Sequence, residues 1–225
     1  MESNQTRCYR CVGDIRNMIK YGKTKSGNQR YICRACGKTR VKNYAYLAYK
    51  GDINQNIIQL TKEGLGIRST ARILKISATT LLKRIVSIAK NIVKPNITKG
   101  KTYEVDELCT YIRHKRNYIW LVYALERNSK TVVSFNVGKR TNKTLNRVLE
   151  TLKLSDAKKI FTDRLKNYRY LIDKKVHSVK RFGTNHIERK NLTLRTHLKR
   201  LNRRTICFSK SLVIFTAVLK IYFWI

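Results

Sequence analysis

A single carboxylate, Glu188, stands in the basic C-terminal segment of the chain. The 52 residues after Asp173 contain this one acid among 13 lysines and arginines. A glutamate on a helix usually pairs with a base three or four positions away, but those positions hold Thr184, Asn185, Asn191 and Leu192. We therefore expect Glu188 to bind a metal cation, while the bases around it bind a polyanion.

Two other acids stand at strand-like positions far upstream of Glu188. Asp106 lies in the strand-like segment 103–108, and Asp163 follows the strand-like segment 159–162. Glu188 itself opens a basic helical pattern in which four apolar side chains are expected to pack inward: Ile187, Leu194, Leu198 and Leu201. The remaining face of that helix is left for Glu188, Asn191 and Arg195.

Three converging acids suit the chemistry of phosphodiesters. Two divalent ions about 4 Å apart can activate the attacking oxygen and stabilise the leaving one, and carboxylate oxygens are the ligands that Mg²⁺ prefers. We therefore predict that Asp106, Asp163 and Glu188 are catalytic and bind Mg²⁺, or Mn²⁺ in its place. The alternative for each acid alone is a solvated or ion-paired surface group, and Glu104 and Glu107 are rivals of Asp106 by spacing.

Cysteines form two close pairs near the N-terminus. The pairs are separated by 21 residues, and their members are Cys8 and Cys11, then Cys33 and Cys36. Four thiolates complete a closed tetrahedral site, so the spacing predicts a structural Zn²⁺ in a small zinc-ribbon module, with Gly37 permitting the turn at the second pair. The alternative is free or disulfide-bonded cysteines, which a reducing cytoplasm makes less suitable.

Helical periodicity follows the cysteine module. Ile67–Leu74, a short break and a second pattern from Ala78 have the proportions of a helix-turn-helix, with Ser77 placed to cap the second helix. The exposed N-terminal half of a recognition helix contacts DNA, which makes four residues candidates for DNA binding: Thr79, Thr80, Lys83 and Arg84. An ordinary helical bundle with a basic face is the alternative.

These elements predict four segments. They are a zinc module at 1–42, a helix-turn-helix domain at 52–93, a linker at 94–101 with the only proline, and an α/β catalytic domain at 102–225 with a mixed sheet covered by helices. Strands are expected at 103–108, 118–125, 131–137, 159–162 and 177–180, and helices at 142–152 and 185–201.

Composition favours nucleic acid as the partner. Fifty Lys and Arg against 13 Asp and Glu give a net charge of +37, which repels itself unless a polyanion compensates it. A membrane surface is the competing polyanion, but the bases run along the whole chain. The N-terminus has no apolar signal-like run, and the apolar run 211–225 is too short for a span. We expect a cytoplasmic, nucleoid-associated protein with a buried C-terminal helix and no membrane contact.

The chain resembles the transposases of the bacterial insertion-sequence-one family, which have an RNase H-like DDE catalytic domain. The resemblance covers essentially the whole chain. It rests on the paired cysteines and the helix-turn-helix, and on five further segments: 105–107, 118–124, 162–163, 181–201 and 208–211. The family pattern places its three acids at Asp106, Asp163 and Glu188. After the second acid the family usually has a small or aromatic residue, where this chain has Arg164 and Leu165.

The resemblance implies a function. Such a transposase binds the terminal inverted repeats of its element as double-stranded DNA, cleaves the ends with metal-activated water and joins the 3′ hydroxyls to target DNA. Both ends must meet in one complex, so a homo-oligomer is expected. Arg195, seven residues after Glu188, matches the basic residue that these enzymes use against DNA phosphate.

Two alternatives remain at the level of sequence. A non-enzymatic sequence-specific DNA-binding regulator, or a decayed transposase, would use the same zinc and helical modules. A tyrosine recombinase would need Tyr222 to reach a phosphate beside His197 and Arg200, but Tyr222 lies in an apolar run that is expected to be core.

Overall fold

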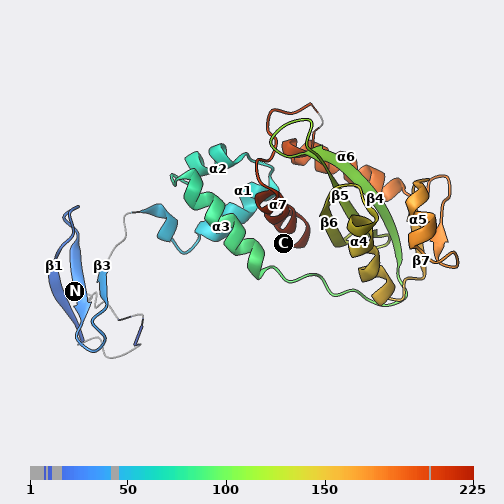
Figure 1. Ribbon diagram of the computed structural model, residues 1–225. Coiled ribbons are helices and arrows are strands. Elements are labelled where there is room, and N and C mark those ends of the chain that lie inside the picture. Colours follow the sequence, from blue (N-terminus) through green and yellow to red (C-terminus); the bar gives the residue numbers. More distant parts are fainter. Residues whose placement is uncertain (1–7, 9, 12–16, 42–45, 203) are drawn as a thin grey trace. The chain divides into compact units, whose positions relative to one another are not determined.

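The computed structural model describes residues 8, 10–11, 17–41, 46–202 and 204–225. The predicted module at 1–42 is therefore described in part. The chain divides into two compact units, residues 1–50 and residues 51–225. Figure 1 shows the elements of both units. The predicted boundaries inside the second unit, including the linker at 94–101, remain predictions.

The first unit contains a small antiparallel sheet in the order β1-β2-β3, formed by Met18–Lys23, Gln29–Cys33 and Thr39–Val41. A 3₁₀ turn, η2, follows at Leu47–Tyr49. Cys33 ends β2, and the turn after it is closed by a hydrogen bond from the Gly37 N–H to the Cys33 carbonyl. Gly37 has a φ of +67°, so its lack of a side chain allows the turn that the cysteine spacing predicted.

The second unit begins with three helices: α1 at Ile53–Lys62, α2 at Ile67–Ile73 and α3 at Ala78–Asn91. The two predicted helices at the turn are confirmed to within a residue. The Ser77 hydroxyl accepts a hydrogen bond from the Thr80 N–H at 3.0 Å, so Ser77 caps α3 as expected. Helix α3 buries an apolar stripe that consists of Leu81, Ile85 and Ala89.

The mixed sheet has the strand order β6-β5-β4-β7-β8. Strands β4, β5 and β6 pair antiparallel, and β7 and β8 continue parallel to β4. The predicted mixed sheet is therefore confirmed. The elements of this part are β4 Thr102–Tyr111, β5 Tyr118–Glu126, β6 Val132–Gly138, α4 Asn142–Leu154, β7 Lys159–Thr162, α5 Lys166–Leu171, β8 His177–Ser178, α6 Asn185–His197, η3 Lys199–Leu201 and α7 Leu212–Trp224.

Several elements differ from the pattern-based prediction, since β4 runs to Tyr111 instead of residue 108 and β8 ends at Ser178 instead of residue 180. Helix α5 was not predicted, because it has six residues and buries only Tyr168. The predicted helix 185–201 ends at His197, where Leu198 adopts a non-helical conformation and a 3₁₀ turn follows. All four apolar side chains of its predicted inner stripe are nevertheless buried, including those after the break.

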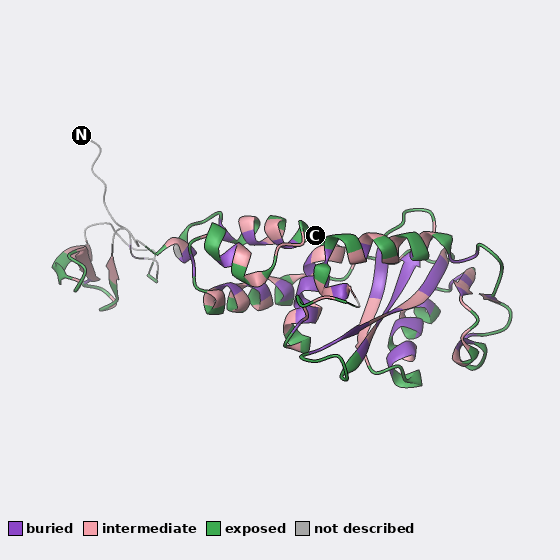
Figure 2. Ribbon diagram, turned by 90° about the horizontal axis from the view of Figure 1, so that it is seen from above, coloured by how far each residue is buried: buried purple, intermediate pink, exposed green. Residues whose placement is uncertain are grey.

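Helices cover both faces of the sheet (Figures 1 and 2). One core cluster joins strand residues such as Tyr103 and Val105 to Leu145 and Leu149 of α4 and to Tyr168 of α5. On the opposite face α6 lies against β4, and α7 contacts β6. The inner sides of these helices are buried while their outer sides are exposed (Figure 2).

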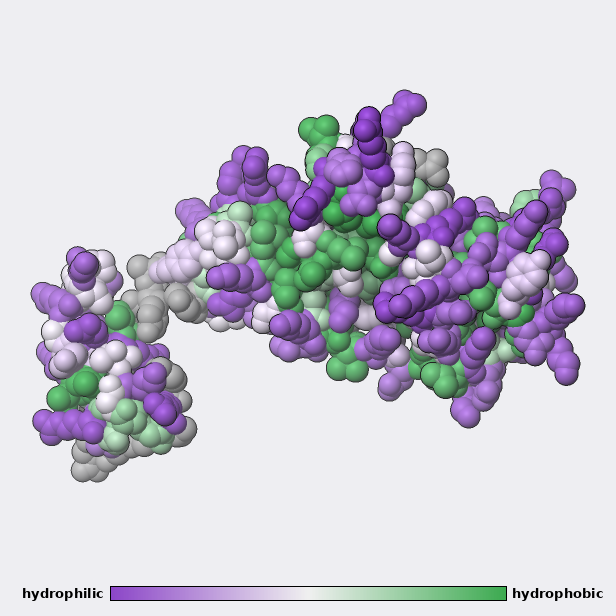
Figure 3. All heavy atoms as spheres, viewed as in Figure 1, coloured by the Kyte–Doolittle hydropathy of each residue, from purple (hydrophilic) through white to green (hydrophobic). Residues whose placement is uncertain are grey.

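The C-terminal helix α7 is buried as predicted. It packs on α1 and α3 as well as on β6, and its Phe215, Val218, Leu219 and Ile221 are nearly inaccessible. Figure 3 shows apolar side chains gathered where α3 and α7 meet, while hydrophilic side chains dominate around them. In the part of the chain that the structure describes, no helix is both long and apolar enough to cross a membrane.

Gly64 is a site at which a methyl group cannot be accommodated. Gly64 follows α1 with a φ of +74°, and a Cβ there would lie 1.8 Å from the carbonyl oxygen of His197. We expect Gly64→Ala to lower the free energy of unfolding by about 2 kcal/mol or more, through backbone strain and collision. Urea denaturation measures this. The control is Gly66→Ala, where φ is −69° and no atom lies within 4 Å of the added methyl group; equal losses in both variants would contradict the prediction.

Candidate active site

Strand pairing brings the first two predicted acids together. Val105 of β4 is paired with Thr162 of the parallel neighbour β7. The residue that follows Val105 is Asp106, and the residue that follows Thr162 is Asp163. The Oδ1 atom of Asp163 accepts a hydrogen bond from the Leu165 N–H at 3.0 Å, which orients this carboxylate at the start of the loop to α5. Asp106, in the middle of β4, and Asp163, directly after the C-terminal end of β7, therefore lie side by side.

Glu107 is the third carboxylate of this cluster. Oxygen atoms of Asp106, Glu107 and Asp163 all lie within 4.8 Å of one another, a spacing that can hold a metal ion. The two Glu107 oxygens also have protein partners: Tyr168 donates its hydroxyl at 2.5 Å and Arg140 its guanidinium at 3.1 Å. Spacing made Glu107 a rival of Asp106, and the structure places both in one group.

Glu188 lies on the helix beside this cluster and is not one of its three members. It stands in the first turn of α6, is exposed, and accepts a hydrogen bond from the Thr184 hydroxyl at 2.7 Å. One turn further along the same helix, the Asn191 amide donates to Asp106 Oδ2 at 2.6 Å. Helix α6 is thus attached to the acidic cluster next to Glu188, whose role as a ligand remains a prediction.

The cluster concentrates negative charge in a partly buried place. The pKa of Asp106 is raised from its usual 3.8 to about 7, chiefly by burial and also by the charges of Glu107 and Asp163, against the opposing hydrogen bonds from the Glu107 N–H and Asn191. Burial likewise raises the pKa of Glu107, against the hydrogen bonds from Tyr168 and Arg140. A divalent cation would stabilise the charged form of these carboxylates, so the donor set fits Mg²⁺.

The side chain of Arg164 is not buried beside the acids. Its side chain is exposed, whereas Leu165 packs against the apolar core under α4 and α5. The departure from the family pattern after the second acid therefore adds an exposed base at the edge of the site. An exposed base of this kind is compatible with an anionic substrate.

The four predicted zinc ligands lie together in the first unit. The Sγ atoms of Cys8 and Cys36 are 3.6 Å apart, those of Cys11 and Cys33 3.5 Å, and those of Cys11 and Cys36 3.7 Å. The N–H groups of Cys11 and Arg10 lower the pKa of the Cys8 thiol to about 6. Thiolates are the form that binds zinc, so this donor set fits a closed tetrahedral Zn²⁺ site.

The predicted DNA-binding residues of α3 occupy different environments. Thr79 and Lys83, four residues apart, are exposed on one face. The Thr80 hydroxyl lies 2.8 Å from the capping hydroxyl of Ser77, and Arg84 donates to Asn54 of α1 at 3.4 Å. Thr79 and Lys83 therefore present the more accessible pair.

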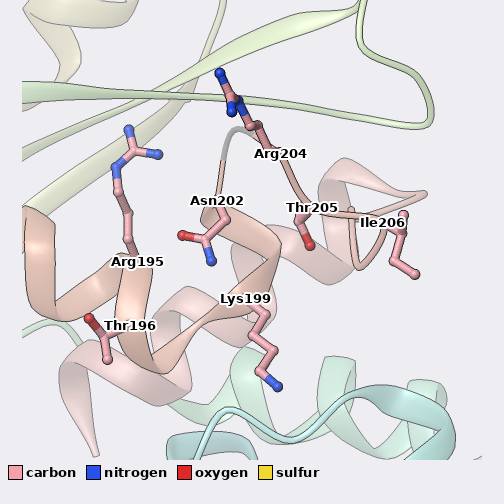
Figure 4. A pocket seen from close by; sticks show the side chains of 7 residues that line it. All are labelled: Arg195, Thr196, Lys199, Asn202, Arg204, Thr205 and Ile206. Carbon is pink, nitrogen blue, oxygen red and sulfur yellow. The ribbon is translucent and has the colours of Figure 1, made fainter.

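Arg195 lines a basic cavity at the end of α6. Its guanidinium donates to the carbonyl oxygens of Leu201 at 2.7 Å and Cys109 at 3.5 Å. The cavity has a volume of about 790 Å³, and in Figure 4 the side chains of Arg195 and Arg204 extend in the same direction while Lys199 points away from them. It is completed by Thr196, Asn202, Thr205 and Ile206.

Comparison with known proteins identifies the family. A family model described as IS1 transposase matches residues 101–225, which include the whole sheet and all three predicted acids. The chain belongs to the IS1 transposase family. A second model, described as the InsA C-terminal domain, matches residues 44–88. This segment contains the helix-turn-helix elements α1, α2 and most of α3.

The curated relatives of this chain include InsB proteins. It is 41% identical over 108 residues to the insertion element IS1 2 protein InsB of Escherichia coli (strain K12), covering 48% of the chain and 65% of that protein. It is 38% identical over 119 residues to the insertion element IS1 protein InsB of Shigella flexneri, covering 53% and 91%. The match thus spans less than two thirds of the first relative's length.

Solved structures with a weaker likeness are retroviral. One is a simian T-cell lymphotropic virus intasome in complex with the PP2A regulatory subunit B56 gamma, at 15% identity and a TM-score of 0.39, covering 72% of this chain and 66% of that one. Another is the HTLV-2 integrase catalytic core domain in complex with magnesium, at 17% identity and a TM-score of 0.36, covering 57% and 86%.

The raised pKa of Asp106 predicts an unusual effect on stability. An acid whose pKa is about 7 when folded and 3.8 when unfolded binds more protons in the folded state between these values, so the contribution of Asp106 to stability falls as the pH rises from about 4 to about 7. Without added divalent cations, we expect Asp106→Asn to be more stable than wild type at pH 8, with the difference shrinking toward pH 4. Urea denaturation at both pH values measures this, with the exposed Asp156→Asn as control. An unchanged or lower stability of Asp106→Asn at pH 8 would contradict the assigned charge state.

Proposed function

We propose that this chain is a DNA transposase that cleaves the ends of its element and transfers the strands to target DNA with divalent metal ions. The observation that carries the proposal is the acidic cluster formed by the middle of β4 and the end of β7, inside the segment that matches the IS1 transposase model. Burying several carboxylates at one place costs free energy unless a partner compensates their charge. In a chain with a net charge of +37, such a cluster therefore indicates a functional role for these acids.

We propose an RNase H-like fold for the catalytic part. Three consecutive antiparallel strands, with the first strand central and two later strands added parallel to it, support the assignment. In this arrangement Asp106 comes from the central strand and Asp163 from its parallel neighbour. Glu188 comes from the helix that covers the same strand.

The proposed chemistry uses the chain's residues as follows. Asp106, Asp163 and Glu188 supply carboxylate oxygens on one side of the scissile phosphate, with Glu107 beside them. Mg²⁺ or Mn²⁺, when bound there, lowers the pKa of water and neutralises charge on the phosphate. A water oxygen attacks phosphorus and the bond to the 3′ oxygen breaks, which leaves a 3′ hydroxyl. In the second step the oxygen of that hydroxyl attacks a phosphodiester phosphorus of the target DNA and loses its proton, while the bond from this phosphorus to the target's own 3′ oxygen breaks and the released 3′ oxygen takes up a proton.

Basic side chains support double-stranded DNA as the substrate. Thr79 and Lys83 are exposed on α3, the position of a recognition helix, where base edges and phosphates are contacted. The cavity with Arg195, Lys199 and Arg204 lies at the other end of the helix that carries Glu188, and it suits backbone phosphates. Terminal inverted repeats are the proposed recognition sequence. Because strand transfer requires both ends, we propose a homo-oligomer acting on the nucleoid in the cytoplasm.

Loss of any one of the three acids is expected to abolish strand cleavage. Asp106→Asn, Asp163→Asn and Glu188→Gln each remove a charged ligand, so cleavage of a labelled end duplex with Mg²⁺ should fall by a factor on the order of 10³. Gel-shift affinity for the same duplex should be unchanged. Glu150→Gln, on α4, is the control and should cleave like wild type. Equal products from wild type and Glu188→Gln would refute the assignment of Glu188, and a wild type that binds but never cuts would favour a DNA-binding regulator.

Removal of one cysteine is expected to release zinc. Cys33→Ser should reduce bound zinc from about one ion per chain to nearly none, since a structural site needs all four ligands. We expect weaker binding of the end duplex together with this loss. Metal analysis of the purified protein measures the first effect and a gel shift the second. The exposed Cys207→Ser lies outside the cluster and should retain zinc; zinc retention by Cys33→Ser would refute the site.

A further inference from the structure

Glu104 is a fully buried acid two residues before Asp106 on β4. Its side chain has no accessible surface, although the chain has an overall charge of +37. Alternate residues of a strand point to the same face of a sheet, so Glu104 and Asp106 both face α6, while Glu107 faces α5. The proposed chemistry gives Glu104 no part, and a buried carboxylate needs strong partners to be tolerated.

The partners of Glu104 lie at the start of α6. Glu104 Oε2 accepts a hydrogen bond from the Ile187 N–H at 2.9 Å, and Oε1 lies 2.7 Å from His186 Nδ1. Arg127 Nε is 3.5 Å from Oε1. The first N–H groups of a helix have no partner within the helix, and the helix dipole favours a negative charge there. Glu104 therefore anchors the N-terminus of α6 to the central strand.

This anchor lies next to Glu188 in the chain. Ile187, whose N–H is bound, is the residue before Glu188 and is fully buried. A second attachment follows one turn later, where Asn191 donates to Asp106 at 2.6 Å and accepts from the Tyr123 hydroxyl at 2.8 Å. Glu188 is thus bracketed by two contacts of α6 with the sheet. Both contacts fix its backbone relative to Asp106.

We propose that Glu104 is a positioning residue for metal binding, which sets the distance between Glu188 and Asp106 by holding the first turn of α6 on β4. The inference rests on the proposed role of Glu188 as a ligand. Outer partners of metal ligands typically change metal affinity by about 10- to 100-fold when they are removed. Glu104 acts through the backbone of α6 and does not itself contact the metal.

The test uses full-length protein with four substitutions. Glu104→Ala removes the anchor, Glu104→Asp keeps the charge but shortens its reach, and Glu104→Gln keeps an oxygen that accepts from the Ile187 N–H. Glu126→Gln is the matched control, because Glu126 is also a buried acid of this sheet that accepts two backbone N–H groups, from Asn128 and Ser129, in the turn after β5.

Two measurements are made on each protein. Electron paramagnetic resonance of Mn²⁺ gives metal affinity without any need for activity, and cleavage of the end duplex at varied Mg²⁺ gives the concentration for half-maximal rate. We expect Glu104→Ala and Glu104→Asp to weaken Mn²⁺ affinity about 10-fold or more and to raise the Mg²⁺ requirement equally, with duplex affinity unchanged. Glu104→Gln should remain within about threefold of wild type, and Glu126→Gln should match it.

Several results would overturn the inference. Wild-type metal affinity in Glu104→Asp, or in a folded Glu104→Ala, would show that the anchor does not position the site. An equal loss in Glu126→Gln would show that any buried acid of the sheet has the same effect. If wild type cleaves and Asp106→Asn does not while the Glu104 variants behave like wild type, the positioning role fails and the proposed function stands. If wild type neither binds Mn²⁺ at these acids nor cleaves, the proposed function fails first.

Discussion

The parallel pairing of β4 with β7 is the contact on which the candidate site depends. It sets Val105 opposite Thr162 and so places Asp106, in the middle of β4, beside Asp163 at the end of β7. Burial raises the pKa of Asp106, and the nearby charge of Asp163 adds to this effect. The folded chain therefore keeps an unfavourable concentration of negative charge that a divalent cation would relieve. This is the physical link between the sheet and the proposed metal chemistry.

Strand β4 attaches helices to both of its faces through acids. Glu104 and Asp106 contact α6, by the Ile187 N–H and by Asn191 respectively, while Glu107 contacts Tyr168 of α5. Strand geometry turns neighbours to opposite faces, so Asp106 and Glu107 contact different helices although their carboxylates belong to one cluster. The helix that carries Glu188 is fixed by polar contacts at its start and by the buried side chains of Ile187 and Leu194.

The excess of basic residues is organised around these acids. Arg127 and Arg140 reach buried glutamates on β4, and each guanidinium also lies over an aromatic ring, that of Phe161 or Trp120. Other bases line the open cavity at the end of α6. Arg195 has both roles, since it donates hydrogen bonds to backbone carbonyls and also lines the cavity. A basic side chain in this protein can therefore stabilise the fold and still face a polyanion.

The sequence by itself determined the local elements and the residues that can do chemistry. Alternating apolar residues predicted the strands, the CxxC spacing predicted four convergent cysteines, and Ser77 predicted the start of α3, because these depend on short-range geometry. Only the tertiary structure decided which acids meet. It joined Glu107 to Asp106 and Asp163, and it buried Glu104 under α6. It also ended α6 at His197 and packed α7 against α1, α3 and β6. Those outcomes depend on which segments cross above a given strand, and spacing along one chain does not contain that information.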